Sequence, residues 1–289
     1  MSATTAVGAS RTRVSLGRVV VTVGFVYALI PLVWLVISAT KSDPALFSTF
    51  GFAFADEFNL FDNLRRTVTH QDGIFLRWMA NTVLYAGVSA VVATGLAAMC
   101  GYALAKYSFR GRELIFAIIV GAIMVPTTAL VIPLFLMFSD WGLTNTAWAF
   151  ILPSIVNPFG VFLARIFASS SIPDDLIDAA RVDGAGEFRI FRSVGLRLMS
   201  PGLITVLLFT LVTSWNNYFL PLVMFSSPDR FPITVGLANW NAAAATGTGG
   251  QLLFSLVITG SLLAILPLVG AFLFLQRYWV GGLTLGAVK

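Results

Sequence analysis

Six long apolar runs divide this chain, and they decide what it can fold into. A helix needs roughly 20 apolar residues to cross a bilayer, and each run is close to that length. Only 11% of the residues are charged and 57% are hydrophobic, whereas a soluble domain has about 25% charged residues. We therefore predict an all-α integral membrane protein with six transmembrane helices, at about residues 18–39, 80–104, 114–138, 147–167, 201–224 and 252–275.

The distribution of lysine and arginine predicts the orientation of these spans. With a cytoplasmic N-terminus, thirteen of the 18 basic residues fall inside and five fall outside, so both termini are predicted to be cytoplasmic. We expect residues 1–15 to form a disordered cytoplasmic N-terminus and residues 16–289 to form one six-helix transmembrane domain. The first run is too long for the core of a signal peptide, so we interpret it as a retained span.

Two polar regions outside the spans also carry expectations. The last outer loop, at about 226–250, contains "NWNAAAATGTGGQ", a small-residue stretch with little tendency to hold one shape. The loop between the fourth and fifth spans, at about 168–200, is cytoplasmic in this topology and contains "SIPDDLIDAARVDGAGEF" (171–188). The second region is acidic and punctuated by glycine, unlike the apolar sequence on either side.

Several kinds of chemistry are not supported by the residues present. A P-loop requires Gly directly before its Lys, but the three lysines follow Thr40, Ala105 and Val288. The span centres carry no ionisable residue, which argues against proton coupling. One histidine, His70, and one cysteine, Cys100, do not make a clustered metal site. We expect no catalytic residues, no metal site and no cofactor bound by this chain.

The acidic segment predicts a short helix at about 172–182. Ser171 and Asp174 have the spacing of a capping box, and Pro173 suits a first turn. Gly184 can adopt the left-handed conformation that ends a helix. A second helix is expected to follow, with Phe188, Phe191, Gly195 and Leu198 on its apolar stripe.

An isolated helix of this length is marginal in water, so it needs a surface to dock against. Asp178 and Asp183 offer charges to a basic partner, and the small residues Ala179, Ala180, Gly184 and Ala185 permit close approach. The pattern alone leaves two interpretations open. One is a docking surface for a partner, and the other is a well-capped loop in solvent.

The segment resembles the cytoplasmic "EAA" loop found in permease subunits of binding-protein-dependent ABC importers. The residues in register are Ile172, Pro173, Leu176, Ala179, Ala180, Asp183, Gly184, Ala185 and Phe191. The stretches "KYSFRGRE" (106–113), "GLTNTAWAFILP" (142–153), "SWNNYFLPLVM" (214–224) and "GGLTLGAVK" (281–289) also look like this family, in its maltose-permease-like carbohydrate subgroup. Asp178 replaces the usual Glu, and Arg197 stands where the family usually has Pro.

This resemblance implies a multi-pass protein of a bacterial inner membrane that is not itself an enzyme. Its implied partners are a second, different permease subunit, two ATPase subunits or domains that bind ATP and Mg, an extracytoplasmic sugar-binding protein and the lipid bilayer. No nucleic acid partner is expected. The short acidic helix becomes a coupling helix, with Asp178, Ala179, Ala180, Asp183, Gly184 and Ala185 as its ATPase-coupling residues.

Candidate pathway residues lie near the end of the fifth span. Amides, hydroxyls and aromatic faces suit a sugar, and the residues of these types are Thr213, Trp215, Asn216, Asn217 and Tyr218. The same polar side chains would also serve as hydrogen-bonding glue between helices. The alternatives to a di- or oligosaccharide importer are a stand-alone secondary carrier or channel, a membrane scaffold that moves nothing, and an importer of glycerol-3-phosphate-type cargo.

Overall fold

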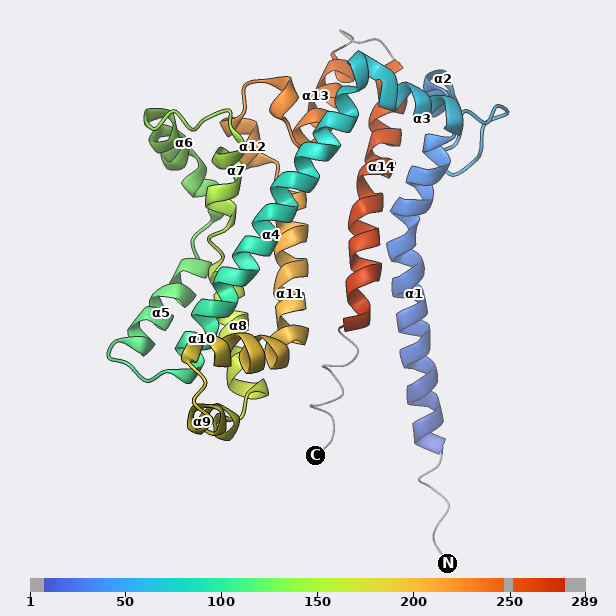
Figure 1. Ribbon diagram of the computed structural model, residues 1–289. Helices are drawn as coiled ribbons and strands as arrows, with labels where there is room; N and C mark the ends of the chain where they lie inside the picture. Colours follow the sequence, from blue (N-terminus) through green and yellow to red (C-terminus); the bar gives the residue numbers. More distant parts are fainter. Residues whose placement is uncertain (1–7, 247–251, 279–289) are drawn as a thin grey trace, which may run out of the picture. The chain divides into compact units, whose positions relative to one another are not determined.

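A computed structural model describes residues 8–246 and 252–278, and it is helical with no strand in those ranges (Figure 1). The helices are α1 (Gly8–Ala39), α2 (Asp43–Ser48), α3 (Leu60–Thr69), α4 (Ile74–Lys106), α5 (Arg112–Ile123), α6 (Val131–Asp140), α7 (Ala147–Ser154), α8 (Pro158–Ser171), α9 (Asp174–Val182), α10 (Glu187–Ile190), α11 (Leu196–Trp215), α12 (Phe219–Met224), α13 (Ile233–Ala245) and α14 (Leu252–Leu275). The predicted all-α fold is therefore confirmed. The expected disordered segment 1–15 lies partly outside the described residues, and α1 begins at Gly8.

Four helical stretches in the described ranges are long and apolar enough to cross a membrane, and the number rises to six if each of two bent pairs forms one span. The predicted third span is the pair α5 and α6, which bends by 93° between Ile123 and Thr127. The predicted fourth span is the pair α7 and α8, which bends by 40°. Each bend occurs in a short break beside a proline, Pro126 or Pro158, which cannot donate a backbone hydrogen bond. Six spans remain a prediction.

The chain divides into two compact units. The first contains residues 1–68 and 240–263, and so includes α1, α2, α3 as far as Val68, the last part of α13 and the first part of α14. The second contains residues 69–239 and 264–289, and so includes α4 to α12.

Close packing of α4, α8 and α11 forms the centre of the second unit (Figure 1). Small residues set the spacing of these helices. A Cβ atom on Gly101 of α4 would lie 2.6 Å from the backbone nitrogen of Arg165 in α8, and one on Gly202 of α11 would lie 2.1 Å from the ring of Phe167. Helices that approach this closely are typical of membrane bundles, where van der Waals packing and not the hydrophobic effect holds helices together.

The last outer loop, at about 226–250, is only partly as the sequence predicts. The alanine-rich part of the last outer loop is helical, because α13 continues to Ala245, so the expectation of an irregular stretch there is wrong. Alanine has the highest helix propensity, which explains the difference. The remainder of that stretch and the tail 281–289 lie mainly or wholly outside the described residues.

Candidate functional site

Helix α9 starts and stops by local backbone chemistry. Ile172 is extended, as expected for a residue before proline, and Pro173 is the N-cap with no side-chain capping bond. Ser171 is the last residue of α8, so the capping box predicted from Ser171 and Asp174 is wrong. At the other end, Gly184 is left-handed with φ +77°, as predicted.

The C-terminus of α9 is a complete Schellman motif. The backbone N–H of Ala185 donates to the carbonyl oxygen of Ala180 at 3.0 Å, and that of Gly184 donates to Arg181 at 3.0 Å. Both Ala180 and Ala185 pack against the apolar cluster beneath the helix. The motif thus closes the helix and fixes the direction in which the chain leaves it.

One apolar side chain anchors α9 to the second unit. Ile177 is buried, in a cluster that includes Ile172, Ile190, Phe191 and Met199. The predicted stripe of the second helix is confirmed at Phe191 and Gly195, which are buried, but Phe188 is 72% exposed and Leu198 is 37% exposed. A π-helical turn at Phe191–Gly195 joins α10 to α11 and shifts the helical register, so the stripe does not continue on one face.

Lys106, the last residue of α4, holds the start of α9. Its Nζ donates to the carbonyl oxygen of Ile172 at 2.5 Å and to Asp174 Oδ1 at 2.7 Å. The Lys106 side chain is only 5% exposed, so these two acceptors take the place of water in stabilising its positive charge. The hydrogen bond from Lys106 also lowers the pKa of Asp174 below its ordinary value.

Tyr107, the next residue, is joined to the end of α9 through a chain of polar contacts. Its hydroxyl donates to Glu187 Oε2 at 2.8 Å, and Glu187 Oε1 accepts from Arg181 Nε at 2.8 Å. Arg181 Nη1 also donates to Asp178 Oδ1 at 3.0 Å. Partial burial, followed by the contact with Glu187, raises the pKa of Tyr107 to about 12, and the hydrogen bond to Glu187 raises the pKa of Arg181.

The outward side of α9 is an apolar strip with an acidic margin. Leu176 is 47% exposed and Val182 is 88% exposed, with exposed Ala179 between them at helical spacing. We call Leu176, Ala179 and Val182 the α9 strip. Because Ile177 faces the other way and carries the anchoring, the strip is free to contact another molecule.

A comparison with protein families settles what kind of chain carries this helix. The family model described as "Binding-protein-dependent transport system inner membrane component" matches residues 93–280, a range that includes α9 and its anchors. The chain belongs to this family. It is therefore a multi-pass membrane protein and a permease component that works with other transporter subunits.

Individual relatives of this inner membrane component are permeases too. This chain is 39% identical to the arabinooligosaccharides transport system permease protein AraQ of Halalkalibacterium halodurans. The match extends over 217 residues, which is 75% of each chain. The chain is 32% identical over 265 residues to the lactose transport system permease protein LacG of Rhizobium radiobacter, which covers 91% of each. The fold matches a chain of a bacterial ABC transporter involved in the import of the acidic polysaccharide alginate, with TM-score 0.80, 23% identity and coverage of 96% of this chain and 100% of that one.

In this permease component, the six predicted coupling residues separate into two groups. The side chains of Asp178, Ala179 and Asp183 are exposed, as is Gly184, whereas Ala180 and Ala185 are half-buried against the cluster. Sequence reasoning did not include Leu176 and Val182 among the coupling residues. The signal that could have identified Val182 is an apolar residue next to the acidic end of a short polar helix.

The predicted pathway residues of the permease component lie at the end of α11 and the start of α12. Trp215 is buried, and Asn217 is half-buried with its Oδ1 accepting the backbone N–H of Leu220 at 3.3 Å. Thr213 and Asn216 are exposed, but each donates to a carbonyl of its own helix, Phe209 and Val212 respectively. Tyr218 is 42% exposed. Thr213, Asn216 and Tyr218 are thus exposed on the surface of the chain, and their role in the pathway stays a prediction.

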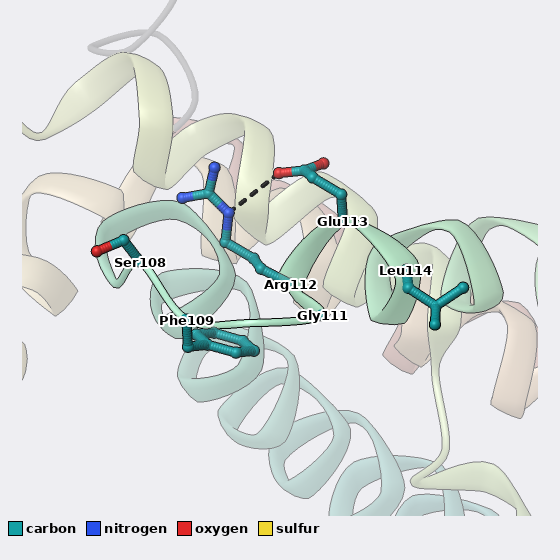
Figure 2. A pocket seen from close by; sticks show the side chains of 6 residues that line it. All are labelled: Ser108, Phe109, Gly111, Arg112, Glu113 and Leu114. Carbon is teal, nitrogen blue, oxygen red and sulfur yellow. Dashed lines mark hydrogen bonds and ion pairs between the residues drawn. The ribbon is translucent and has the colours of Figure 1, made fainter.

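A shallow pocket of about 290 Å³ lies in the connection between α4 and α5 (Figure 2). Arg112 and Glu113 stand side by side on its wall, with Arg112 Nε donating to Glu113 Oε1 at 3.0 Å (Figure 2). Glu113 also accepts from Arg165 of α8 at 2.8 Å. These ion pairs satisfy the charges of the pocket internally, so we assign it no ligand.

Metal-binding chemistry finds no support in the described ranges. No group of three or more His, Cys, Asp or Glu side chains comes close enough there to hold a metal ion. Cys100 is half-buried in α4.

Proposed function

We propose that this chain is the permease subunit of an ATP-driven importer of di- or oligosaccharides. It would form half of the translocation pathway, with a second, different permease forming the other half. Its six spans would alternate between outward and inward access, with both termini in the cytoplasm. The observation that carries the proposal is α9, a helix anchored by Ile177 and Lys106 that leaves the α9 strip uncovered.

This arrangement supports coupling to a separate ATPase subunit. A partner that moves the α9 strip moves α4 and α11 with it, because Lys106 and the cluster around Ile177 join α9 to both helices. The partner can shift the equilibrium between two states only if it contacts α9 differently in each of them. ATP and Mg would bind to the ATPase subunits. The contact with the ATPase subunit would include Asp178, Ala179, Asp183 and Gly184. The half-buried Ala180 and Ala185 would set how far α9 projects from the apolar cluster.

The sugar class is supported by the relatives. Their names include arabinooligosaccharides, lactose and diacetylchitobiose, all of which are neutral di- or oligosaccharides. A glycerol-3-phosphate-type anion would favour positive charge along the path, and the sequence of the spans offers none near their centres. An extracytoplasmic binding protein would deliver the sugar.

The proposal is tested with the complete transporter reconstituted in vesicles. A di- or oligosaccharide should raise ATP hydrolysis and be taken up only when ATP is present. Gly184→Pro and Ala180→Trp should abolish uptake of labelled sugar while the protein stays in the membrane, because both changes displace the α9 strip. Uptake by the purified chain alone, or wild-type uptake by both variants, would reject the proposal in favour of a stand-alone carrier.

A further inference from the structure

The segment after α1 contains an unusual concentration of phenylalanine. Six phenylalanines fall within residues 47–61, in the sequence "FSTFGFAFADEFNLF". All six side chains are exposed, by 44% to 75%, at positions Phe47, Phe50, Phe52, Phe54, Phe58 and Phe61. We call residues 47–61 the Phe hairpin. The proposed transport function does not use it.

The Phe hairpin is held in place by polar groups at its base. Lys41 Nζ donates to the carbonyl oxygen of Phe50 at 2.9 Å, and the backbone N–H of Asn59 donates to Thr40 at 2.8 Å. Asn63 Nδ2 donates to the carbonyls of Ala39 and Lys41 at 3.0 and 2.8 Å. These bonds fix both arms of the hairpin to the end of α1, so the exposure of its phenylalanines is not the consequence of a loose chain.

Burial in this region is reversed relative to a soluble protein. The side chains of Lys41, Asp43, Asn63 and Thr67 are buried, each 3% exposed or less. Asp43 accepts hydrogen bonds from the backbone N–H and the hydroxyl of Ser255, both at 2.9 Å. In water, charged residues are the ones that stay outside and an apolar patch is rare. Polar groups inside and phenylalanines outside indicate that the medium around the Phe hairpin is apolar.

The hairpin also returns to the depth of a membrane-spanning helix. A Cβ atom on Gly51 would lie 3.1 Å from Trp34 Nε1, so this part of the hairpin touches the side of α1. Trp34 is about five residues, or about 7.5 Å, before the end of α1 at Ala39, and the apolar span of this helix is Leu16–Ala39. The loop between α2 and α3 runs beside the last turns of α1 (Figure 1).

We propose that the Phe hairpin is an interfacial membrane anchor, inserted among the lipid glycerol and upper acyl groups of the leaflet at the C-terminal end of α1. Contact between Gly51 and Trp34 places this part of the hairpin beside the last turns of the span, on a helix whose apolar window is only 6% buried within the chain. Phenylalanine has no polar group to satisfy, which suits acyl chains. Asp56 and Glu57, both exposed, lie between Phe54 and Phe58, and their charges keep the hairpin from passing deeper than the glycerol and upper acyl groups.

The proposal is tested by measuring the depth of single nitroxide labels in the intact transporter, with all its subunits, in vesicles of phosphatidylethanolamine and phosphatidylglycerol. Cys100→Ala removes the single native cysteine. Phe52→Cys and Phe58→Cys then carry the label, and Asp62→Cys, whose native side chain is 61% exposed, is the matched control. We expect labels at 52 and 58 to be reached by oxygen at least threefold more than by a water-soluble nickel complex, and the label at 62 to show the reverse.

Two results would overturn the anchor. Access of the nickel complex at 52 and 58 would show that the hairpin lies in water. Low access of both reagents would show that another protein subunit covers it. A second measurement does not depend on labelling at cysteine: benzoylphenylalanine, close to phenylalanine in shape, replaces Phe54 and is photolysed in cell membranes. A lipid adduct supports the anchor, and an adduct with a protein, or none, contradicts it.

Discussion

Two neighbouring residues at the end of α4 reach the two ends of α9 by different means. Lys106 binds the entrance of the helix directly, through Ile172 and Asp174, and Tyr107 reaches its exit through Glu187 and Arg181. Adjacent side chains point in different directions on a chain that is leaving a helix, so one dipeptide can span α9. The dipeptide thus adds polar links between α4 and α9 to the apolar cluster, against which Tyr107 itself packs.

A pH-dependent prediction follows for Tyr107. Its pKa is raised to about 12 in the folded protein, so between about pH 10 and 12 the folded state keeps a proton that the unfolded chain has lost. The contribution of Tyr107 to stability is therefore complete below about pH 10 and is lost as pH rises toward 12. Tyr107→Phe should lower the free energy of unfolding by about 1 kcal/mol at pH 8, because it removes the hydrogen bond to Glu187.

Thermal unfolding of the detergent-solubilised chain, measured from pH 8 to 11.5, checks this expectation. The advantage of the wild type over Tyr107→Phe should shrink at the alkaline end. Glu187→Gln in both backgrounds completes a double-mutant cycle, which separates the hydrogen bond from other effects of each change. A constant difference between wild type and Tyr107→Phe across the whole range would contradict the role assigned to the hydroxyl.

At the scale of the element, backbone conformation at Gly184 decides where α9 ends. Gly184 has φ +77°, where a Cβ atom is strained, whereas Gly186 has φ −68° in the same turn. Neither glycine has an atom within 4 Å of an added Cβ, so the two positions differ in conformation and not in space. Gly184→Ala should cost about 1 kcal/mol of stability and reduce sugar uptake, and Gly186→Ala should be close to neutral.

The glycine pair is measured by thermal unfolding and by vesicle uptake of labelled sugar. Equal effects of the two substitutions would show that the left-handed turn does not matter for α9. The turn itself could be predicted from the sequence, because glycine after a short amphipathic helix has a local meaning. The start of α9 was predicted within two residues, at about 172 against Asp174, but its cap was not, because Ser171 is used to finish α8.

A second glycine pair tests the packing of α4 against α8. A Cβ atom on Gly101 would lie 2.6 Å from both the Cβ of Ala164 and the backbone nitrogen of Arg165, whereas one on Gly95 meets nothing within 4 Å. Gly101→Ala should therefore destabilise the protein by roughly 1–3 kcal/mol, since backbone must move. Gly95→Ala, on the same helix, should leave the unfolding temperature unchanged or slightly higher. If Gly101→Ala unfolds at the wild-type temperature, α4 and α8 do not approach as closely as described.

At the scale of the whole molecule, hydrophobicity made the apolar runs predictable, and the family followed from motifs along the chain. The bends did not follow. Pro126 lies at a 93° bend, yet Pro31, Pro201 and Pro267 lie inside continuous helices. A proline removes a hydrogen bond in each case, so the presence of a proline does not by itself say whether the chain bends there. The pairing of Tyr107 with Glu187, 80 residues apart, could not be predicted either, because it depends on how distant parts of the chain pack together.

The α9 strip gives the last prediction, because it separates assembly from folding. Val182 is 88% exposed, so Val182→Gln should change the free energy of unfolding by no more than about 0.5 kcal/mol. If an ATPase subunit covers the strip, the same change places an amide in an apolar contact and should lower sugar-dependent ATP hydrolysis by about tenfold, which corresponds to about 1.4 kcal/mol. Val182→Ile keeps the apolar surface and should retain activity. Normal ATP hydrolysis by Val182→Gln would mean that the partner does not dock on this strip, and the coupling role of α9 would have to rest on its acidic margin at Asp178 and Asp183 alone.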